Sequence, residues 1–304
     1  MTRVAICICT YKRPDGLTKL LDKLTQLTPA TPDAVVVIDN HKDGEGAAVC
    51  SRLAASYPFE LHYAIEAEPG ISYARNSAVS LALQQQADLI AFLDDDEWPE
   101  PNWLTELIRV QTDTDADAVG GPTLSVFPPN SPESLTSNPY YGADMSIEDG
   151  SRCHLQAAGN FIIRASTISD MGPAFFRTEF AHSGGEDLAF FLTLTQKGAR
   201  MAWAANAVVH EAVPANRMSR DWLKGRIINI ANSRVRVMQI LEPGIVPAAI
   251  RGLKTVALFF QATVWSLIGL LNVTRREHAA MLRWKFLGKF TAHIRHKTVR
   301  EEGH

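Results

Sequence analysis

The sequence has few cysteines and lacks the features of a disulfide-stabilised or zinc-stapled protein. Its 304 residues include four cysteines (Cys7, Cys9, Cys50 and Cys153), whose spacing matches neither a disulfide framework nor a zinc site. Cys7 and Cys9 alternate within an apolar run, as expected of small buried side chains in a reducing cytoplasm. Internal repeats and low-complexity tracts are also lacking. No signal peptide is visible at the start of the chain, so we expect a cytoplasmic location.

A strong overall charge is also lacking, although each part of the chain has one. The net charge is −3, and a content of 46% hydrophobic and 21% charged residues is that of a globular protein with a sizeable core. Residues 1–216 hold 14 basic and 28 acidic side chains, whereas residues 217–304 hold 16 and 5. An acidic part suits metal ions, and a basic helical part suits anionic lipid or nucleic acid. We therefore predict two domains, 1–216 and 217–304.

Apolar runs of strand length alternate with helical spacing in the first hundred residues. The predicted strands are Val4–Thr10, Ala34–Asp39, Glu60–Ile65 and Leu89–Leu93, and the predicted helices include Ala47–Tyr57 and about Ser72–Gln86, with Ser72 as N-cap. This alternation predicts an α/β fold with a mostly parallel sheet covered by helices. Further strands are expected at Gly159–Arg164, Met201–Ala204 and Ala207–His210. Ligands bind such sheets beyond the carboxyl ends of the strands, where Thr10, Asp39 and Asp94 stand.

An acidic run, Asp94-Asp95-Asp96-Glu97, directly follows the fourth predicted strand. Four neighbouring carboxylates repel one another strongly without a counter-ion. A Mg²⁺ or Mn²⁺ ion shared with phosphate oxygens would relieve that repulsion. The alternative is a solvated acidic turn that caps the following helix. The run therefore predicts either a metal site or a helix cap.

Three further features carry candidate chemistry. Glu186-Asp187 follows two glycines at a predicted helix start, where the helix dipole favours a carboxylate able to accept a proton from a hydroxyl; simple helix capping is the alternative. Arg75, near the same sheet edge, could pair with a phosphate, stack on a base or neutralise Asp94. His210, at the end of a predicted strand, could bind a metal or serve structure alone.

Five motifs occur in the order in which family 2 glycosyltransferases carry them. They are residues 8–14 (ICTYKRP), 37–40 (VIDN), 70–76 (GISYARN), 92–97 (FLDDDE) and 185–188 (GEDL), spread over roughly Val4 to His210. The sequence therefore resembles that family, and within it the bacterial exopolysaccharide enzymes of the succinoglycan type. The resemblance implies a GT-A fold, in which a Rossmann-like nucleotide-binding half merges with an acceptor-binding half.

The resemblance also implies roles for individual residues. The positions assigned to the nucleotide site are Thr10, Tyr11, Arg13, Asp39, Arg75, Asp94 and Asp95. Asp96 and His210 are assigned to a Mg²⁺ or Mn²⁺ ion, Asp187 to the catalytic base, and Glu186 to the surroundings of the acceptor. The implied reaction is inverting transfer of a hexose from a nucleotide sugar, by default a UDP-sugar. The Gln-x-x-Arg-Trp motif of processive members is missing from residues 216–222, so we expect a single sugar to be added.

Two other functions remain open at this stage. A sugar nucleotidyltransferase shares the α/β layout and metal use, but its glycine-rich, arginine-containing loop is missing after the first strand. A membrane protein that binds nucleotide sugars without turnover would have the same binding residues. Detection of transfer or slow donor hydrolysis separates the second alternative from an enzyme.

Thr255–Leu271 is an uncharged segment of 17 residues, slightly shorter than the ~20 residues that span a bilayer. Arg251 and Lys254 precede it and Arg275 and Arg276 follow it, which argues against a single crossing. We predict an interfacial helix that attaches the protein, as a peripheral or monotopic protein, to the cytoplasmic face of the inner membrane. The predicted acceptor is a polyprenyl-diphosphate-linked saccharide at that anionic surface, and lipid fits the segment better than nucleic acid. A true span and a buried core helix are the alternatives.

Overall fold

The computed structural model describes residues 2–141, 145–172, 175–270 and 273–294, and these residues form two compact units. The first unit runs to Ala181 and resumes at Phe190–Val213. The second holds His182–Ala189 and the chain from Pro214 onward. Leu271, the last residue of the predicted uncharged segment, lies outside the described residues.

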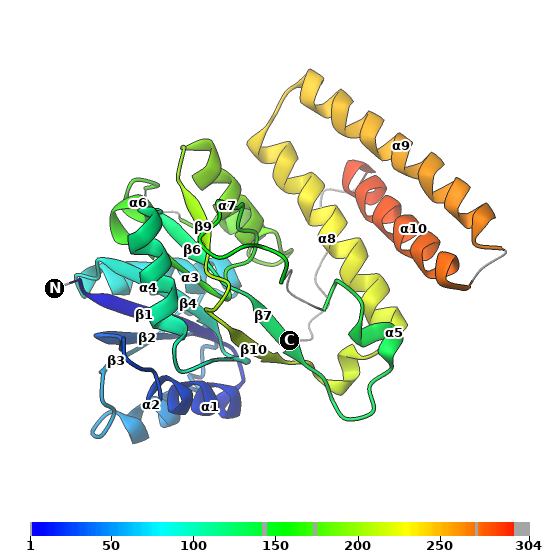
Figure 1. The fold of residues 1–304 in the computed structure, drawn as a ribbon. Helices are drawn as coiled ribbons and strands as arrows, with labels where there is room; N and C mark the ends of the chain where they lie inside the picture. Colours follow the sequence, from blue (N-terminus) through cyan, green and yellow to red (C-terminus); the bar gives the residue numbers. More distant parts are fainter. Residues whose placement is uncertain (1, 142–144, 173–174, 271–272, 295–304) are drawn as a thin grey trace. The chain divides into compact units, whose positions relative to one another are not determined.

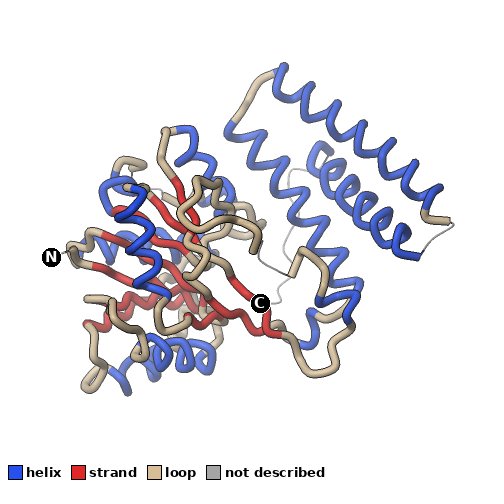
Figure 2. The backbone as a smooth tube through the Cα atoms, in the orientation of Figure 1, coloured by secondary structure: helices blue, strands red, loops and turns tan. Residues whose placement is uncertain are grey.

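Seven of the described strands of the first unit form a mixed sheet (Figures 1 and 2). In spatial order the strands are β3 (Glu60–Ile65), β2 (Ala34–Asp39), β1 (Val4–Thr10), β4 (Leu89–Asp94), β8 (Phe161–Arg164), β6 (Ala118–Gly120) and β9 (Met201–Trp203). The first four are mutually parallel, whereas β8 pairs antiparallel with both β4 and β6. The prediction of a mostly parallel sheet is therefore confirmed, with one described strand reversed.

Helices cover both faces of this sheet, because the strand side chains alternate between two apolar clusters. Ile6 and Ile8 belong to the cluster that contains α1 (Pro14–Leu24), α2 (Ala47–Leu53) and α4 (Trp103–Thr114). Ala5 and Cys7 belong to the other cluster, with α3 (Ile71–Gln84), α6 (Ala165–Ser169) and the Phe190–Gln196 part of α7 (Glu186–Gln196). A strand buried on both faces needs apolar residues at every position, which is why these strands are continuous apolar runs.

A smaller sheet begins where the acidic run ends, at Glu97. Its strands are β5 (Glu97–Pro99), β10 (Val209–Ala212) and β7 (Thr123–Val126), with β10 in the centre. β10 pairs antiparallel with β5, which places Glu211 opposite Glu97 and His210 opposite Trp98. The remaining short elements of this unit are α5 (Glu133–Thr136) and a 3₁₀ turn (Thr178–Phe180).

Several predicted element boundaries were wrong by a few residues. The helix predicted to end at Tyr57 ends at Leu53, and the strand predicted as Ala207–His210 is Val209–Ala212. The strands Val4–Thr10, Ala34–Asp39 and Glu60–Ile65 are confirmed at both ends. The predicted N-cap Ser72 is instead inside α3, which is preceded by Gly70 at φ 130°, and the Ser72 hydroxyl donates to the carbonyl of Arg177. A Cβ at position 70 would lie 2.7 Å from that of Ala181, so the loop approaches too closely for any residue but glycine.

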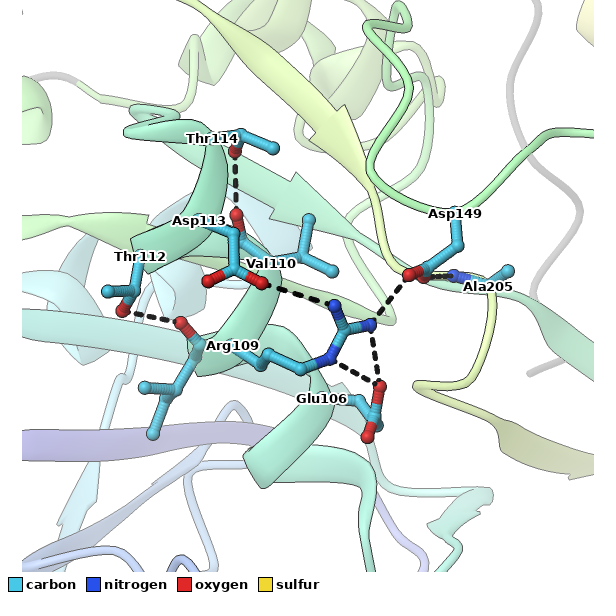
Figure 3. A network of polar contacts seen from close by, with 9 residues as sticks. Glu106, Arg109, Val110, Thr112, Asp113, Thr114, Asp149 and Ala205 are labelled. Carbon is cyan, nitrogen blue, oxygen red and sulfur yellow. Dashed lines mark hydrogen bonds and ion pairs between the residues drawn. The ribbon is translucent and has the colours of Figure 1, made fainter.

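A polar network on the surface of α4 holds the loop that precedes β8 (Figure 3). Arg109 contacts Glu106 on its own helix at 2.8 Å and Asp149 in the loop at 2.6 Å. Asp149 in turn accepts a hydrogen bond from the backbone N–H of Ala205. The hydrogen bonds to Asp149 and Glu106 raise the pKa of Arg109 above its usual value, so the guanidinium stays charged. This network is structural and lies outside the predicted site.

From Pro214 onward, the described residues of the second unit form three long helices and a 3₁₀ turn (Ala215–Arg217), and the other stretch of this unit contains the start of α7. The helices are α8 (Arg220–Leu241), α9 (Ile245–Ile268) and α10 (Val273–Ile294), and α10 packs along both others (Figure 1). α8 and α10 approach closely at Gly288, which lies against the carbonyl of Ile228, and Asn232 donates to the Gly288 carbonyl at 3.3 Å. The predicted helical character of this part is confirmed, and residues 242–244 separate α8 from α9.

Candidate active site

Three parallel strands end side by side at one edge of the large sheet. In the strand register Thr10 is paired with Asp39, and Cys9 is paired with Asp94. β4 then turns through Asp95 and Asp96 into β5 at Glu97. The carboxyl ends of β1, β2 and β4 therefore bring together residues that are up to 85 positions apart in the sequence.

Asp95 anchors the acidic turn to the loop after β1. Its side chain is buried and accepts hydrogen bonds from the Thr10 hydroxyl at 2.8 Å and from the Arg13 guanidinium at 2.9 Å. Burial raises the pKa of Asp95 to about 6, against the lowering effect of Arg13 and Thr10. Both carboxylate oxygens thus have partners within the protein. The structure gives Asp95 a structural task, and its contact with a nucleotide stays a prediction.

Arg13 joins the two central carboxylates of the turn. The same nitrogen, Nη1, lies 2.9 Å from an Asp95 oxygen and 2.7 Å from an Asp96 oxygen. Burial lowers the pKa of Arg13, but the charges of Asp96 and Asp95 outweigh it and raise the pKa overall. Asp96 keeps about a quarter of its side chain exposed (24%), so it is open to a ligand.

Asp94 and Glu97 lie together at the other side of the turn. The Asp94 carboxylate is 42% exposed and lies 3.4 Å from the buried guanidinium of Arg75, which also packs over the ring of Phe176. Glu97 is buried and accepts a hydrogen bond from the backbone N–H of Asp94. Burial, followed by the charge of Asp94, raises the pKa of Glu97 well above its usual range.

A glycine of the neighbouring strand region makes this crowding possible. A Cβ at Gly159 would lie 2.6 Å from a Glu97 oxygen and 3.1 Å from an Asp94 oxygen. Real Cβ atoms do not approach other heavy atoms to 2.6 Å, so any side chain here requires the Glu97 carboxylate to shift. Gly159 was predicted only as the start of a strand, which in the structure begins at Phe161. Its part in shaping the site was missed by sequence reasoning.

Asp39 organises the loop after β2. It is fully buried, and its two oxygens accept hydrogen bonds from the backbone N–H groups of His41 and Gly46 and from the Tyr63 hydroxyl. The exposed ring of Tyr11 lies edge-on to His41, with the ring centroids 5.5 Å apart. These contacts place Tyr11 and the Asp39 loop at the same strand edge. Their contact with a nucleoside stays a prediction.

Asn40 is a further residue to which sequence reasoning assigned no role. Its side-chain amide donates to the carbonyls of Glu66 and Glu68, and its oxygen accepts from the backbone N–H of Gly70. It therefore ties the end of β2 to the loop that begins the Arg75 helix. Asn40 was part of the quoted VIDN motif, but its partners are 26 to 30 positions away and depend on the strand pairing.

His210 lies in a separate cluster beside the acidic turn. Its Nε2 atom is 2.7 Å from Glu100, and its ring stacks on Trp98 with centroids 5.7 Å apart. The ammonium of Lys19 lies 3.0 Å from the centre of the Trp98 ring. The assignment of His210 to a metal stays a prediction. The structure adds Glu100, Trp98 and Lys19 as neighbours that the sequence did not indicate.

Glu186 and Asp187 begin α7, in the stretch that belongs to the second unit. Gly184 and Gly185 precede them with φ values of 70° and 104°, a conformation that L-residues rarely adopt. Glu186 is buried and Asp187 is half-buried. The predicted helix start after the two glycines is confirmed, and the roles as base and acceptor contact stay predictions.

The turn has the donor chemistry of a magnesium or manganese site. Within the described residues, no group of three or more His, Cys, Asp or Glu side chains is arranged to hold a metal alone. Mg²⁺, however, is commonly held by one or two carboxylates together with substrate phosphates. Asp94 and Asp96 offer two partly exposed carboxylates, and the buried carboxylate of Glu97 accepts a hydrogen bond from the backbone N–H of Asp94. These residues fit such an ion when a diphosphate completes its ligands.

A mixed sheet whose strand ends carry this acidic turn is the arrangement of a GT-A glycosyltransferase. Residues 5–172 match the model of glycosyl transferase family 2. The chain belongs to that family.

Relatives and a solved structure agree with this assignment. The chain is 31% identical to the succinoglycan biosynthesis protein ExoM of Rhizobium meliloti over 241 residues, 77% of this chain and 75% of that protein. It is 26% identical to the glucosyl-dolichyl phosphate glucuronosyltransferase of Haloferax volcanii, over 79% of each chain. Its fold is similar to that of the Pyrobaculum calidifontis mannosyltransferase PcManGT, solved with GDP-Man and Mn²⁺. That similarity has a TM-score of 0.63 at 17% identity and covers 95% of this chain and 86% of that one.

Proposed function

We propose that this glycosyltransferase moves one hexose from a nucleotide sugar, most simply a UDP-sugar, to a lipid-linked saccharide during synthesis of a cell-surface polysaccharide. Two relatives support the acceptor class: one is a succinoglycan biosynthesis protein, and the other is named for a glucosyl-dolichyl phosphate acceptor. The observation that carries the proposal is the acidic turn, where Asp94 and Asp96 lie partly exposed at the ends of parallel strands.

The donor diphosphate is proposed to bind at this turn. Asp96 would hold a Mg²⁺ or Mn²⁺ ion, which supplies positive charge against the leaving diphosphate, and Asp94 and Asp95 are proposed to contact the nucleotide. Arg13 and Arg75 add fixed positive charge on either side, since each already pairs with a carboxylate of the turn. Thr10, Tyr11 and the Asp39 loop form the adjoining surface proposed for the nucleoside, and His210 is proposed as a further contact near the metal.

The acceptor hydroxyl needs a base, and we assign that task to Asp187. A carboxylate in the first turn of a helix is stabilised in its charged form and can accept a proton from the attacking hydroxyl. Attack from the face opposite the diphosphate inverts the configuration at the anomeric carbon. Glu186, which is buried next to Asp187, is proposed to support the acceptor side.

The part of the chain from residue 217 is proposed to attach the enzyme to the cytoplasmic face of the inner membrane. Within the described residues, α9 is the helix long enough and apolar enough to cross a membrane, by length and composition. Most of its large apolar side chains are exposed, including Ile245, Leu253, Phe260 and Leu267. Basic residues on both sides of the apolar segment favour a helix in the interface over a span.

A donor-release assay tests the proposed function. The full-length protein is incubated with UDP-, GDP- and dTDP-sugars, Mn²⁺ or Mg²⁺, and membranes that carry lipid-linked acceptors. Release of the nucleotide together with labelled sugar in the lipid fraction is expected for one donor. Donor binding with neither transfer nor hydrolysis across the panel would favour the non-catalytic alternative, and release of diphosphate from a nucleoside triphosphate would favour a nucleotidyltransferase.

A further inference from the structure

Three arginines line a cavity at one end of the helices of the second unit. The cavity has a volume of about 260 Å³, and its lining includes Arg220, Arg276 and Arg283. Arg220 is the first residue of α8, Arg276 lies in the first turn of α10 and Arg283 in its middle. The rest of the lining includes Ser266 near the end of α9, and Gly269 and Leu270 just beyond it. The start of α8, the end of α9 and the start of α10 therefore meet here (Figure 1).

Two of the arginines are held in place by uncharged acceptors. Arg276 donates from Nε to the carbonyl of Gly269 at 2.8 Å and from Nη2 to that of Leu270 at 3.0 Å. Arg283 donates to the hydroxyl of Ser266 at 3.3 Å. A guanidinium has five N–H donors, so these bonds orient both side chains and leave donor capacity for a ligand. They do not neutralise either charge.

The cavity carries more positive than negative charge. The carboxylate paired with these arginines, among the described residues, is that of Glu277, which lies 3.1 Å from Arg220. Three guanidinium groups against one carboxylate leave an excess of two positive charges. A bound anion would offset the mutual repulsion of these like charges. The planar fork of arginine fits the oxygens of a phosphate in a bidentate manner.

The apolar side of the cavity indicates what the anion is attached to. Leu270 lines the cavity and is 68% exposed, and the apolar surface continues along α9 through Leu267 and Phe260. An arginine-lined cavity that opens onto an exposed apolar helix suits a molecule with a phosphate head and a hydrocarbon chain. Its volume is below the roughly 300–1,000 Å³ of pockets for whole drug-sized ligands, which agrees with a head group as occupant.

We propose that this cavity binds the phosphate head group of a membrane lipid, with the lipid chains against the exposed side of α9. The site lies wholly in the second unit and involves none of the residues assigned to sugar transfer. It deepens the proposed membrane attachment by making it depend on a phosphate head group as well as on apolar burial. Binding to vesicles without donor or acceptor tests it separately from the proposed reaction.

The test compares two pairs of substitutions that remove equal charge. Arg220→Gln with Arg283→Gln removes two of the three positive charges of the cavity lining. Arg276, which is bonded to the Gly269 and Leu270 carbonyls, is left unchanged. Arg226→Gln with Arg275→Gln removes one charge from each of the same two helices outside the cavity lining. Binding to phosphatidylcholine vesicles with and without phosphatidic acid is measured by co-sedimentation. The cavity pair is expected to weaken binding to the phosphatidic acid vesicles about 10-fold more than the control pair, because charge-assisted hydrogen bonds are lost.

Two outcomes would overturn the proposal. Equal weakening by both pairs shows that general surface charge, and not the cavity, holds the membrane. Inorganic phosphate that binds the native protein as tightly as phosphatidic acid vesicles do, by calorimetry, shows that the ligand is a free anion. Vesicles with polyprenyl phosphate in place of phosphatidic acid identify the preferred lipid. Binding to either lipid that the cavity pair weakens more than the control pair supports the proposal. If the cavity pair unfolds, as judged by circular dichroism, each single glutamine variant is compared with its single control.

Discussion

The guanidinium of Arg13 lies 2.7 Å from the carboxylate of Asp96, and the same nitrogen lies 2.9 Å from Asp95. Asp96 is proposed to bind the metal, so in this structure a cation of the protein itself already neutralises it. The pair lies in the acidic turn, where the proposed metal would bring a positive charge to Asp96 and the diphosphate a negative charge to Arg13. Arg13 can then stay near Asp95 and contact the phosphate, while Asp96 turns to the ion.

The first prediction concerns Asp96. Asp96→Asn keeps the size of the side chain but removes the charge that would hold the ion. Transfer is expected to fall by at least ~100-fold, comparable with the loss of a main electrostatic stabiliser, and excess chelator is expected to abolish transfer by the native enzyme. Initial rates with saturating donor measure the effect, and Asp113→Asn on the surface of α4 serves as control. Full activity in chelator would sink the metal assignment.

The second prediction concerns Asp187. Asp187→Asn preserves the helix start but cannot accept a proton, so transfer is expected to fall by ~10²–10⁴ while donor binding survives. Calorimetry with UDP, run beside the transfer assay, separates binding from chemistry. Asp170→Asn, at an exposed position, is the matched control. A native transfer rate in Asp187→Asn would leave Asp187 as a helix cap only.

The third prediction uses the raised pKa of Asp95. Its pKa is about 6 in the folded protein against a usual 3.8, so the folded state binds the extra proton between these values. The contribution of Asp95 to the free energy of unfolding is therefore highest below about pH 4 and falls as pH rises through 6. Asp95→Asn is expected to remove this slope, so that the native-minus-variant difference in unfolding free energy changes by about 1–3 kcal/mol across the window. Urea unfolding at several pH values measures the slope; identical slopes would show that Asp95 titrates normally.

The fourth prediction concerns Gly159. Gly159→Ala places a methyl group against the oxygens of Glu97 and Asp94, so the buried Glu97 carboxylate must shift. We expect a loss of about 1–3 kcal/mol in stability, as in other overpacked sites, together with weaker binding of donor and metal. Gly225→Ala, in α8 with nothing within 4 Å of the new Cβ, is the control and should not weaken donor binding. Unchanged donor affinity in Gly159→Ala would mean that the turn tolerates displacement.

The fifth prediction concerns membrane attachment. The protein is expected to sediment with membranes, and high salt is expected to weaken the attachment, since each basic residue near an anionic surface adds on the order of 1 kcal/mol. Phe260→Asp, on the exposed side of α9, is expected to release much of the protein, whereas Arg52→Asp in α2 is expected to leave sedimentation unchanged. A reporter fused after His304 is expected to stay cytoplasmic. A periplasmic signal would replace the interfacial helix with a true span.

Much of the core could be predicted from local sequence. Val4–Thr10 and Ala34–Asp39 are apolar at every position except the last, and a strand buried on both faces requires that pattern whatever surrounds it. The helix start after Gly184 and Gly185 was likewise predicted, and both glycines have a positive φ that few other residues adopt. The apolar run Leu89–Leu93 placed the acidic turn at a strand end, and the structure confirms this, with Asp94 as the last residue of β4.

What the sequence determined by itself was therefore the first four strands of the large sheet, and the acidic residues Asp39 and Asp94 at the ends of two of them. Only the tertiary structure decided that β8 runs against its neighbours, because an apolar run carries no information on strand direction. It also decided that Asp95 pairs with Arg13 and that His210 pairs with Glu100, 110 positions away. Such contacts depend on which strands become neighbours, and that choice is set by the packing of the whole sheet and not by any local pattern.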